Sequence, residues 1–531
     1  MAGSPARCSS RPRETSRGKS LALVTLAVSL IAGLIAVSGG LPSLEGRTAS
    51  AAFLDTSATR LGRAIVPRAA ARPGKSGIYP LLGSRDAFAA RMLLAQAAER
   101  SLDVQYYIWR NDLSGTLLFD ALRKAADRGV RVRLLLDDST TSGLDTTLAA
   151  LDSHPNIEVR LFNPFAIRWP RTLGYLTDFF RLNRRMHNKS FTADNQATIV
   201  GGRNVGDEYF DATNGMAFVD LDALAVGPVV SEVSRDFDRY WASDSAYPTN
   251  GLLPQTEPAR IEEISSKASQ IALNPNGAKY LEAVKSSPFV RELTEGRLAF
   301  DWTIVRTVSD DPAKGLGRAA PDALLPSMFQ AIVGEPAIRM ELVSAYFVPG
   351  VEGTEWFRSM ANRGVKIQIL TNSLEATDVA AVHAGYAKRR KRLLEAGITL
   401  YELRSLSDGV GPTRGGAGFG SSGSSLHAKT FAVDGSHVFI GSFNFDPRSA
   451  ELNTEMGFVI ESGALAQKVD AEFAVRIPAN SYEVCLAEGG KLYWLEHRGG
   501  ELLRHDVEPS TSFWERLGVS VISLLPVDWL L

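Results

Sequence analysis

The segment RMHNKSFTADNQATIVGGRN, residues 185–204, returns near the other end of the chain as LHAKTFAVDGSHVFIGSFN, residues 426–444. Five residue types recur at the same internal spacing: His187, Lys189, Asp194, Gly201 and Asn204 match His427, Lys429, Asp434, Gly441 and Asn444. Each matched pair is 240 positions apart (427 − 187 = 240). Identical spacing of five residue types indicates an internal repeat, and a repeat determines the architecture of the whole chain.

The sequence around the two motifs also repeats in the same order. The segments 101–109, 130–138 and 157–164 are rich in β-branched and aromatic residues and predict strands, and 115–129 predicts a helix that ends at Gly129. In the second half, 339–349, 365–373 and 398–403 predict strands and 354–364 predicts a helix. This alternation predicts an α/β fold with helices on the faces of the sheets. The paired histidines favour one shared site over two independent tandem domains.

Composition narrows the class of protein. The chain has 531 residues, 45% of them hydrophobic, and a formal net charge of −1. A generic nucleic-acid-binding domain is usually basic, so we expect no nucleic-acid partner. The two cysteines, Cys8 and Cys485, give neither a disulfide framework nor a zinc-binding spacing.

The N-terminus has the features of a targeting segment. Five basic residues precede an uncharged apolar run at 20–41: Arg7, Arg11, Arg13, Arg17 and Lys19. The run is close to the roughly 20 residues needed to span a bilayer, which favours a signal anchor with the body on the exported side. A signal peptide cleaved near Ala-Ser-Ala at 49–51 and a buried helix are the alternatives. Residues 42–75 are expected to form a tether.

The duplicated pattern HxKxxxxDxxxxxxG(G/S)xN resembles the phospholipase D superfamily. DLDALAVGPVV (220–230), SDDPAKG (309–315) and GSFNFDPRSAELNTEMGFVIES (441–462) resemble the bacterial C-type cardiolipin synthases more closely. The resemblance implies two similar α/β-sandwich halves packed around one active site. The expected divisions are 1–75 for the anchor or signal peptide and tether, 76–250 for the first half, 251–325 for a connector, 326–480 for the second half and 481–531 for a tail.

The motif residues suit phosphoryl transfer. Residues i and i+2 of a strand face the same side, so each His-x-Lys presents an imidazole and an ammonium together. Lys189 and Lys429 would stabilise the phosphate oxygens, and Asn204 and Asn444 would donate hydrogen bonds to the substrate. The family implies that one histidine forms a covalent phosphohistidine while the other acts as acid and then base. The analogy assigns the nucleophile to His187.

Other residues around the histidines have alternative roles. A metal site is the competing interpretation, but an ammonium two residues from each imidazole would repel the ion, so we expect no metal and no cofactor. By family analogy Glu455 supports His187, and Asp220 or Asp222 supports His427, each from the opposite half. Asp194 and Asp434 are candidate catalytic residues as members of the motif. Their positions after apolar strands favour a structural role.

Three further segments carry weaker signals. Arginines and aromatic residues interleave over 168–185, which suits either a surface that contacts anionic phospholipids or a solvated loop. The glycine-rich segment 409–425 predicts a flexible loop that could act as a lid. In the tail, five apolar residues share one helix face, which either lies at a membrane interface or packs on the body: Phe513, Leu517, Val521, Leu524 and Leu525. His383 is expected to be a packed core residue.

Taken with the resemblance, these patterns predict a membrane-associated phosphatidyltransferase. The resemblance implies phosphatidylglycerol as acceptor, phosphatidylglycerol or phosphatidylethanolamine as donor, cardiolipin as product and the bacterial inner membrane as location. A phospholipase D that transfers the same intermediate to water is the alternative enzyme, and a phosphodiesterase or nuclease is a weaker one. A lipid-binding pseudoenzyme is the non-enzymatic alternative, but it would not need two complete motifs. The sequence does not indicate a protein partner.

Overall fold

The computed structural model describes residues 33, 40–213, 217–254, 256–257, 260–405 and 424–525. The predicted membrane anchor at 20–41 and the predicted lid at 409–425 fall almost entirely outside these ranges. Within them, no helix combines the length and the apolar character needed to cross a membrane.

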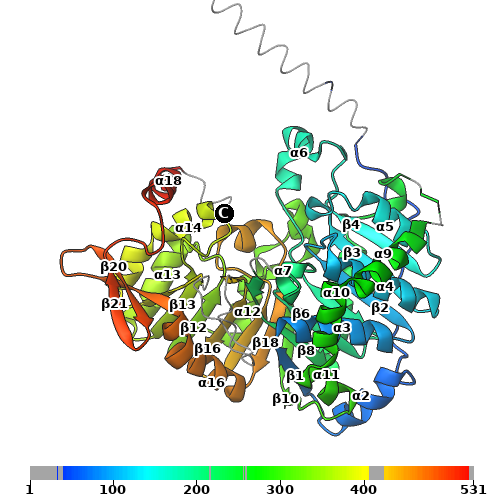
Figure 1. Cartoon of the computed structure of the whole chain (residues 1–531), viewed down its shortest axis with the longest axis horizontal. Helices are drawn as coiled ribbons and strands as arrows, with labels where there is room; N and C mark the ends of the chain where they lie inside the picture. The colour runs from blue at the N-terminus through cyan, green and yellow to red at the C-terminus, as the bar shows by residue number, and fades with distance from the viewer. Residues whose placement is uncertain are drawn as a thin grey trace, which may run out of the picture.

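The first half is built on a nine-stranded mixed sheet in the order β10-β1-β8-β6-β5-β2-β3-β4-β9 (Figure 1). Its strands are β1 (Ser76–Leu81), β2 (Ser101–Tyr106), β3 (Arg131–Asp137), β4 (Ile157–Phe162), β5 (Ser190–Ala193), β6 (Ala197–Gly201), β8 (Asp222–Val226), β9 (Ala246–Pro248) and β10 (Asp301–Thr303). The main helices beside it are α3 (Ser84–Ala97), α4 (Leu113–Asp127), α5 (Asp145–Asp152), α8 (Pro228–Trp241), α9 (Ile261–Leu273), α10 (Pro275–Lys285) and α11 (Pro288–Thr294).

The second half is built on a ten-stranded mixed sheet in the order β11-β18-β17-β16-β12-β13-β14-β19-β20-β21. Its strands are β11 (Val305–Ser309), β12 (Arg339–Ser344), β13 (Lys366–Asn372), β14 (Thr399–Leu403), β16 (Lys429–Val433), β17 (His437–Gly441), β18 (Met456–Glu461), β19 (Ser481–Leu486), β20 (Leu492–Arg498) and β21 (Glu501–His505). Its helices include α12 (Leu325–Val333), α13 (Gly350–Asn362), α14 (Ala380–Ala387), α15 (Arg390–Glu395), α16 (Gly463–Ala471) and α18 (Phe513–Ser523).

The two sheets share one strand order, as the sequence repeat predicts. β8-β6-β5-β2-β3-β4 corresponds to β18-β17-β16-β12-β13-β14, with three parallel strands flanked by antiparallel ones in each half. The predicted helix at 115–129 forms as α4, which Asp112 caps by accepting from the Gly115 N–H, and Gly129 follows with a φ of 90°. The predicted α/β fold is confirmed.

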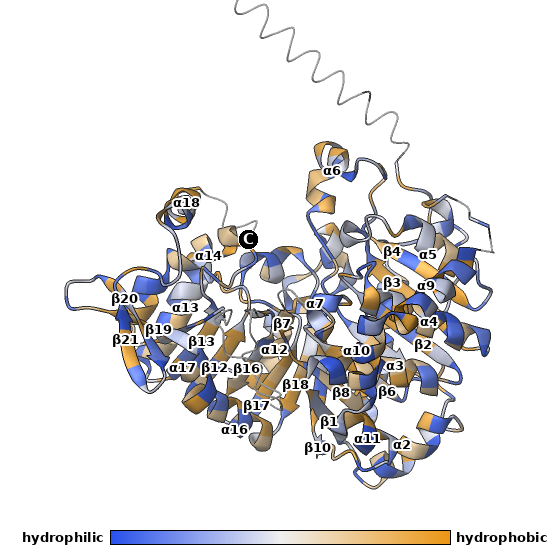
Figure 2. Ribbon diagram, viewed as in Figure 1, coloured by the Kyte–Doolittle hydropathy of each residue, from blue (hydrophilic) through white to orange (hydrophobic). Residues whose placement is uncertain are grey.

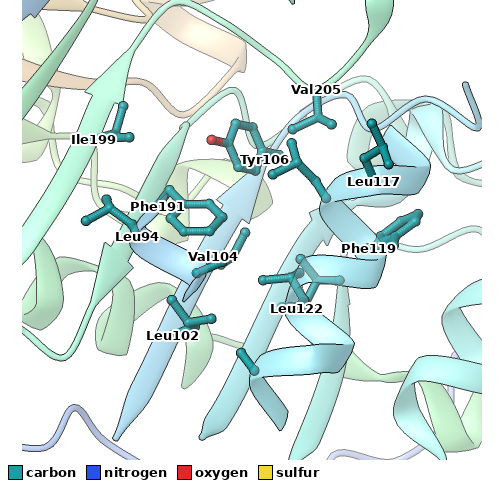
Figure 3. Close-up of a cluster of buried hydrophobic side chains, with 14 of the residues drawn as sticks. Leu94, Leu102, Val104, Tyr106, Leu117, Phe119, Leu122, Phe191, Ile199 and Val205 are labelled. Atoms are coloured by element: carbon teal, nitrogen blue, oxygen red, sulfur yellow. The ribbon is translucent and has the colours of Figure 1, made fainter. Parts of the chain in front are cut away.

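Apolar side chains alternate to both faces of each sheet. On the outer face of the first sheet, Leu102 and Val104 of β2 pack against Leu122 of α4 (Figure 3). A separate buried cluster joins the halves: Ala223 and Ala225 of β8 meet Ile440 of β17 and Phe458 of β18. Figure 2 shows the same arrangement: the strands inside both halves are mostly hydrophobic (orange), and the helices that cover them carry both hydrophobic and hydrophilic residues. The inter-half cluster packs β6 and β8 of the first sheet against β17 and β18 of the second sheet.

The segments outside the two predicted halves are more integrated than expected. Part of the expected tether packs on the first half: the Ser50 carbonyl accepts from Arg133 at 3.0 Å, and the Ser50 hydroxyl accepts from the Trp241 indole at 3.0 Å. The expected connector, 251–325, supplies β10 to one sheet and β11 to the other, and the expected tail supplies β19, β20 and β21. The division into domains stays a prediction.

Candidate active site

Main-chain pairing between the halves positions both histidines. β15 (Ser424–Leu426) pairs in parallel with β7 (Ala217–Val219) of the first half, and the His427 N–H donates to the Val219 carbonyl at 2.8 Å. The arrangement is reciprocal, because the His187 N–H donates to the Thr454 carbonyl of the second half at 2.8 Å. Asp220 follows Val219 and Glu455 follows Thr454, so this pairing places His427 next to Asp220 and His187 next to Glu455.

Those two carboxylates hold the imidazoles. Nδ1 of His187 lies 2.8 Å from Oε2 of Glu455, and Nδ1 of His427 lies 2.6 Å from Oδ2 of Asp220. A proton on each Nδ1 would be donated to the carboxylate, which leaves the Nε2 lone pair available for reaction. Both histidine side chains are 9% exposed, so a substrate atom can reach them while bulk water has little access. Asp222 is not the histidine partner: it pairs at 2.9 Å with buried Arg91.

The two lysines concentrate positive charge at the imidazoles. Lys189 and Lys429 are buried, and Lys189 donates to the His187 carbonyl at 2.6 Å. Burial lowers the pKa of both ammonium groups, that of Lys189 well below its usual value. Burial and both lysines together lower the pKa of His187 well below 6.5, and burial with Lys429 lowers the pKa of His427 to about 4. Both shifts favour neutral imidazoles near neutral pH.

The supporting carboxylates differ in their proton affinity. His427 and Lys429 outweigh burial at Asp220, so the pKa of that carboxyl is lowered and it is ionised. Burial dominates at Glu455 and raises its pKa to about 7, despite Lys189 and the Ser442 hydroxyl. The two histidine–carboxylate pairs are thus alike in geometry and unlike in charge near neutral pH.

Asn204 and Asn444 brace the loops beside the site. Oδ1 of Asn204 accepts from the Ile108 N–H at 3.1 Å, and its Nδ2 donates to the Tyr209 hydroxyl at 3.0 Å. Oδ1 of Asn444 accepts from the Tyr346 N–H at 3.4 Å, the equivalent position after β12. These contacts fix the orientation of both amides, and substrate binding by them stays a prediction.

The structure does not bring Asp194 and Asp434 to the histidines. Both residues have a left-handed backbone, with φ of 52° and 50°. Asp194 accepts from the N–H groups of Arg100 at 2.7 Å and Ser101 at 2.9 Å, at the start of β2. Asp434 accepts in the same way from the residues that lead into β12, at 2.8 Å from Ile338 and 2.9 Å from Arg339. These main-chain contacts support the structural role that the sequence favours for both carboxylates, and a catalytic role for them stays a prediction.

Asp194→Ala should therefore destabilise the fold and spare the chemistry. The substitution leaves buried main-chain N–H groups without an acceptor, and we expect the free energy of unfolding to fall by about 2–4 kcal/mol. At temperatures where the variant is folded, kcat should change by less than about threefold. Denaturant unfolding and initial rates measure the two effects separately. A large loss of kcat at unchanged stability would restore the catalytic interpretation.

Several residues at the site were not singled out from the sequence. The Tyr107 ring lies 5.0 Å from the His187 ring, and the rings of Tyr209 and Phe218 each lie 5.1 Å from that of His427. Isolated aromatic residues carry no spacing signal that could have identified them. The sequence did contain a signal for Asp310, because this residue lies in the SDDPAKG segment that resembles the family. Its Oδ2 accepts from the Glu455 N–H at 2.8 Å.

The arginine- and aromatic-rich segment separates into two kinds of residue. Its arginines pair within the protein: Arg171 with Asp145 at 2.8 Å, and buried Arg185 with Asp137 at 2.7 Å. Its aromatic residues are exposed, Trp169 by 88% and Phe180 of α6 (Gly174–Leu182) by 74%. The expectation that these arginines bind lipid phosphates is not supported for these two. His383 is buried and pairs with Glu508 at 2.9 Å, in agreement with its expected core position.

Two sheets of one strand order and two histidine–lysine pairs, cross-supported by carboxylates, define a phospholipase D-type protein. A family sequence model described as "Cardiolipin synthase, PLD-like domain" matches residues 92–241 and 337–477. The chain therefore belongs to the cardiolipin synthase family of phospholipase D-like proteins.

Individual relatives agree with this assignment. The chain is 52% identical over 474 residues to "Cardiolipin synthase C" of Escherichia coli (strain K12), a match that covers 89% of this chain and 100% of that protein. It is 32% identical over 480 residues to an uncharacterized protein of Helicobacter pylori (strain ATCC 700392 / 26695), covering 89% and 93%. The crystal structure of phosphatidylserine synthase from Haemophilus influenzae Rd KW20 matches with a TM-score of 0.55 at 12% identity, covering 86% and 95%, which shows the shared fold.

Proposed function

We propose that the protein synthesises cardiolipin at a bacterial membrane by moving a phosphatidyl group between two lipids. The observation that carries the proposal is the pair of imidazoles, each held through Nδ1 by a carboxylate of the opposite half, with two buried lysines beside them. The similarity to an Escherichia coli protein named cardiolipin synthase C supports the choice of lipid. The donor is phosphatidylglycerol or phosphatidylethanolamine.

The chemistry proceeds in two balanced displacements. Nε2 of His187 attacks the donor phosphorus, and the bond to the leaving alcohol breaks. Nε2 of His427, which takes up a proton when the anionic phosphate binds beside it, gives that proton to the leaving oxygen. The primary hydroxyl of phosphatidylglycerol then attacks the phosphohistidine, the P–N bond breaks, and His427 takes the hydroxyl proton back. Lys189 and Lys429 stabilise the charge that develops on the phosphate oxygens, which is the main need in such a transition state. Asp220 and Glu455 orient the imidazoles.

Product analysis tests this function directly. Purified protein with vesicles of phosphatidylglycerol, alone or with phosphatidylethanolamine, should produce cardiolipin with release of glycerol or ethanolamine, detected by mass spectrometry. Phosphatidic acid as the main product would identify a hydrolase, and unchanged lipids would refute both. Activity should survive EDTA, because neither displacement requires a metal; a loss that one particular metal restores would contradict the mechanism.

The rate of phosphohistidine formation should fall at both acidic and basic pH, and neither fall should be centred on the usual pKa of histidine or lysine. A nucleophilic imidazole must be neutral, and burial with the two lysines lowers the pKa of His187 below its usual 6.5. Phosphohistidine formation should therefore still be fast at pH 6 and fall only at lower pH. Burial also lowers the pKa values of both lysines below 10.5, so the rate should decline before that pH is reached. Rapid-quench measurement of the phosphoenzyme across pH checks this; an acid limb centred at 6.5 would contradict it.

Two exposed apolar elements support contact with a membrane. The apolar face predicted from the sequence is exposed on α18, with Phe513 at 62% and Leu517 at 41%, and Leu524 directly after the helix is exposed by 84%. Buried Val519 is on the side that packs toward α14. α6 presents Phe180 and lies on the same side of the molecule as α18 (Figure 1). We therefore propose that α6 and α18 both insert into the headgroup region, with the helix of the tail at the interface rather than inside the body.

Vesicle flotation tests the proposed membrane contact. A chain lacking residues 1–39 should still bind vesicles, and Trp169→Ser with Phe180→Ser, or Phe513→Ser with Leu524→Ser, should each weaken binding at least about tenfold, because large apolar side chains no longer insert. Leu273→Ser is the matched control, since Leu273 is 83% exposed but lies on α9. Unchanged binding of a folded variant that carries all four substitutions would refute the interfacial placement.

A further inference from the structure

The second half contains an apolar cavity of about 540 Å³ between α12 and α13. Its lining is mainly aromatic and aliphatic: Phe329, Met340, Trp356, Phe431, Phe443 and Phe445. Cavities of roughly 300–1,000 Å³ with such linings are typical of sites for small apolar ligands. It lies outside the histidine site, and none of the reactions derived above requires it.

The repeat shows that this cavity is not an unavoidable feature of the fold. In the first half, α3 packs directly against α4, and the Phe88 ring lies 5.4 Å from that of Phe210 and 5.6 Å from that of Tyr280 on α10. Ala450 of the cavity lining stands at the position of Phe210, with the offset that relates the histidines (450 − 210 = 240). A methyl group replaces a phenyl ring, so the second half is open where the first half is packed.

One carboxylate, Asp310, links the cavity lining to the histidine site. Its lining residue Leu325 donates its N–H to Oδ1 of Asp310 at 2.7 Å, and Oδ2 of Asp310 accepts from the N–H of Glu455, the partner of His187. Phe443 and Phe445, which flank Asn444 in the chain, belong to the same lining. From Leu325 the cavity follows α12 toward Gly334, a helix of nine residues and therefore about 14 Å long.

The charges of the lining restrict the kind of ligand. Its ionisable residues are all acidic: Glu335, Glu352, Asp446 and Glu451. An anionic headgroup would be repelled here, whereas the two lysines attract it to the histidines. An uncharged hydrocarbon chain fits the apolar lining and is not repelled by these carboxylates.

We propose that this cavity binds one acyl chain of the phospholipid substrate while the phosphate lies between His187 and His427. The identity of the ligand rests on the proposed function, since a phospholipid is the substrate class that supplies both a phosphate and an acyl chain. A bound chain would hold the lipid in register with the histidines, which contributes to catalysis through positioning.

A neutral bromoalkanol tests binding without catalysis. With the full-length protein, 11-bromoundecanol below its micelle concentration should quench tryptophan fluorescence saturably, and most of the quenching should disappear in Trp356→Phe. Ala450→Phe should weaken binding at least about tenfold by filling the cavity as Phe210 fills its counterpart. Ala471→Phe, at an exposed position of α16, is the matched control and should bind normally. His187→Ala should also bind normally.

Kinetics connect the cavity to the substrate. Ala450→Phe should raise KM for long-chain phosphatidylglycerol about tenfold, with kcat/KM for the dihexanoyl lipid changed less than about twofold. Quenching that does not depend on Trp356, or long-chain kinetics unaffected by Ala450→Phe, would overturn the proposal. Concentration-dependent self-association abolished by Ala450→Phe would assign the cavity to a second copy of the chain and also overturn it. Binding of the probe without cardiolipin synthesis would support the cavity while refuting the proposed function.

Discussion

His187→Ala and His427→Ala are each expected to lower kcat by at least about 10³-fold, and the double variant should be little worse than either single variant. Each imidazole has one half of a coupled reaction, since one forms the bond to phosphorus while the other moves the proton. Removal of either imidazole stops the reaction cycle, so removal of the second imidazole lowers the remaining activity little further. Initial rates of cardiolipin formation at saturating lipid measure the effect, with thermal unfolding as the check on folding.

The two histidine variants also separate the roles. Phosphoenzyme trapped by acid quenching should carry its label on a peptide that contains His187, and His427→Ala should slow its formation through loss of the proton donor. A label on the peptide of His427 would reverse the assignment. Losses that multiply in the double variant would mean that the halves contain independent sites, against the reciprocal pairing of His187 with Glu455 and of His427 with Asp220.

The sequence predicted the fold well because its strongest signals were duplicated. Strand patterns at 101–109 and 339–349 recur with the same following helix and strand, and both appear in equivalent places, as β2-α4-β3 and β12-α13-β13. The elements outside the repeat were predicted less well. Residues 42–75 are rich in Ala, Arg, Gly and Pro, and only tertiary contacts such as Ser50 with Arg133 show that part of this segment belongs to the body.

The site was predictable in its residue types and less so in its contacts. The sequence predicted that His-x-Lys lies on a strand and presents both side chains to one side. In the structure His187 and Lys189 directly precede β5, His427 precedes β16, and the charge of Lys429 acts on His187 of the other half. The roles of Asp194 and Asp434 were harder to predict. A carboxylate shared by both repeats suggests a catalytic role, but in the structure each one accepts from main-chain N–H groups at the start of β2 or β12. Asp310 lies more than 100 residues from Glu455 in the chain (455 − 310 = 145), so local sequence could not connect them.

Asp220 and Asp222 provide the sharpest test of the site, because the two residues are close in sequence and opposite in role. Asp220→Asn should lower kcat by about 10²–10⁴-fold with little change in stability, since His427 loses the acceptor that fixes its tautomer. Asp222→Asn should instead lower the free energy of unfolding by about 3–5 kcal/mol, because it leaves the buried guanidinium groups of Arg91 and Arg203 without their carboxylate. Steady-state kinetics and denaturant unfolding on both variants make the comparison.

The opposite pattern, with activity lost at Asp222 and stability lost at Asp220, would show that the histidine partner had been misassigned. The expected pattern follows from where each carboxylate lies. Asp220 precedes β8 and reaches across to Nδ1 of His427 at 2.6 Å, where its charge is matched by a reacting group. Asp222 begins β8 and is matched by Arg91 at 2.9 Å within its own half, so its charge serves packing of the first sheet alone. Although the two aspartates are only two residues apart, Asp220 thus serves the reaction at the junction of the halves and Asp222 serves the stability of the first half.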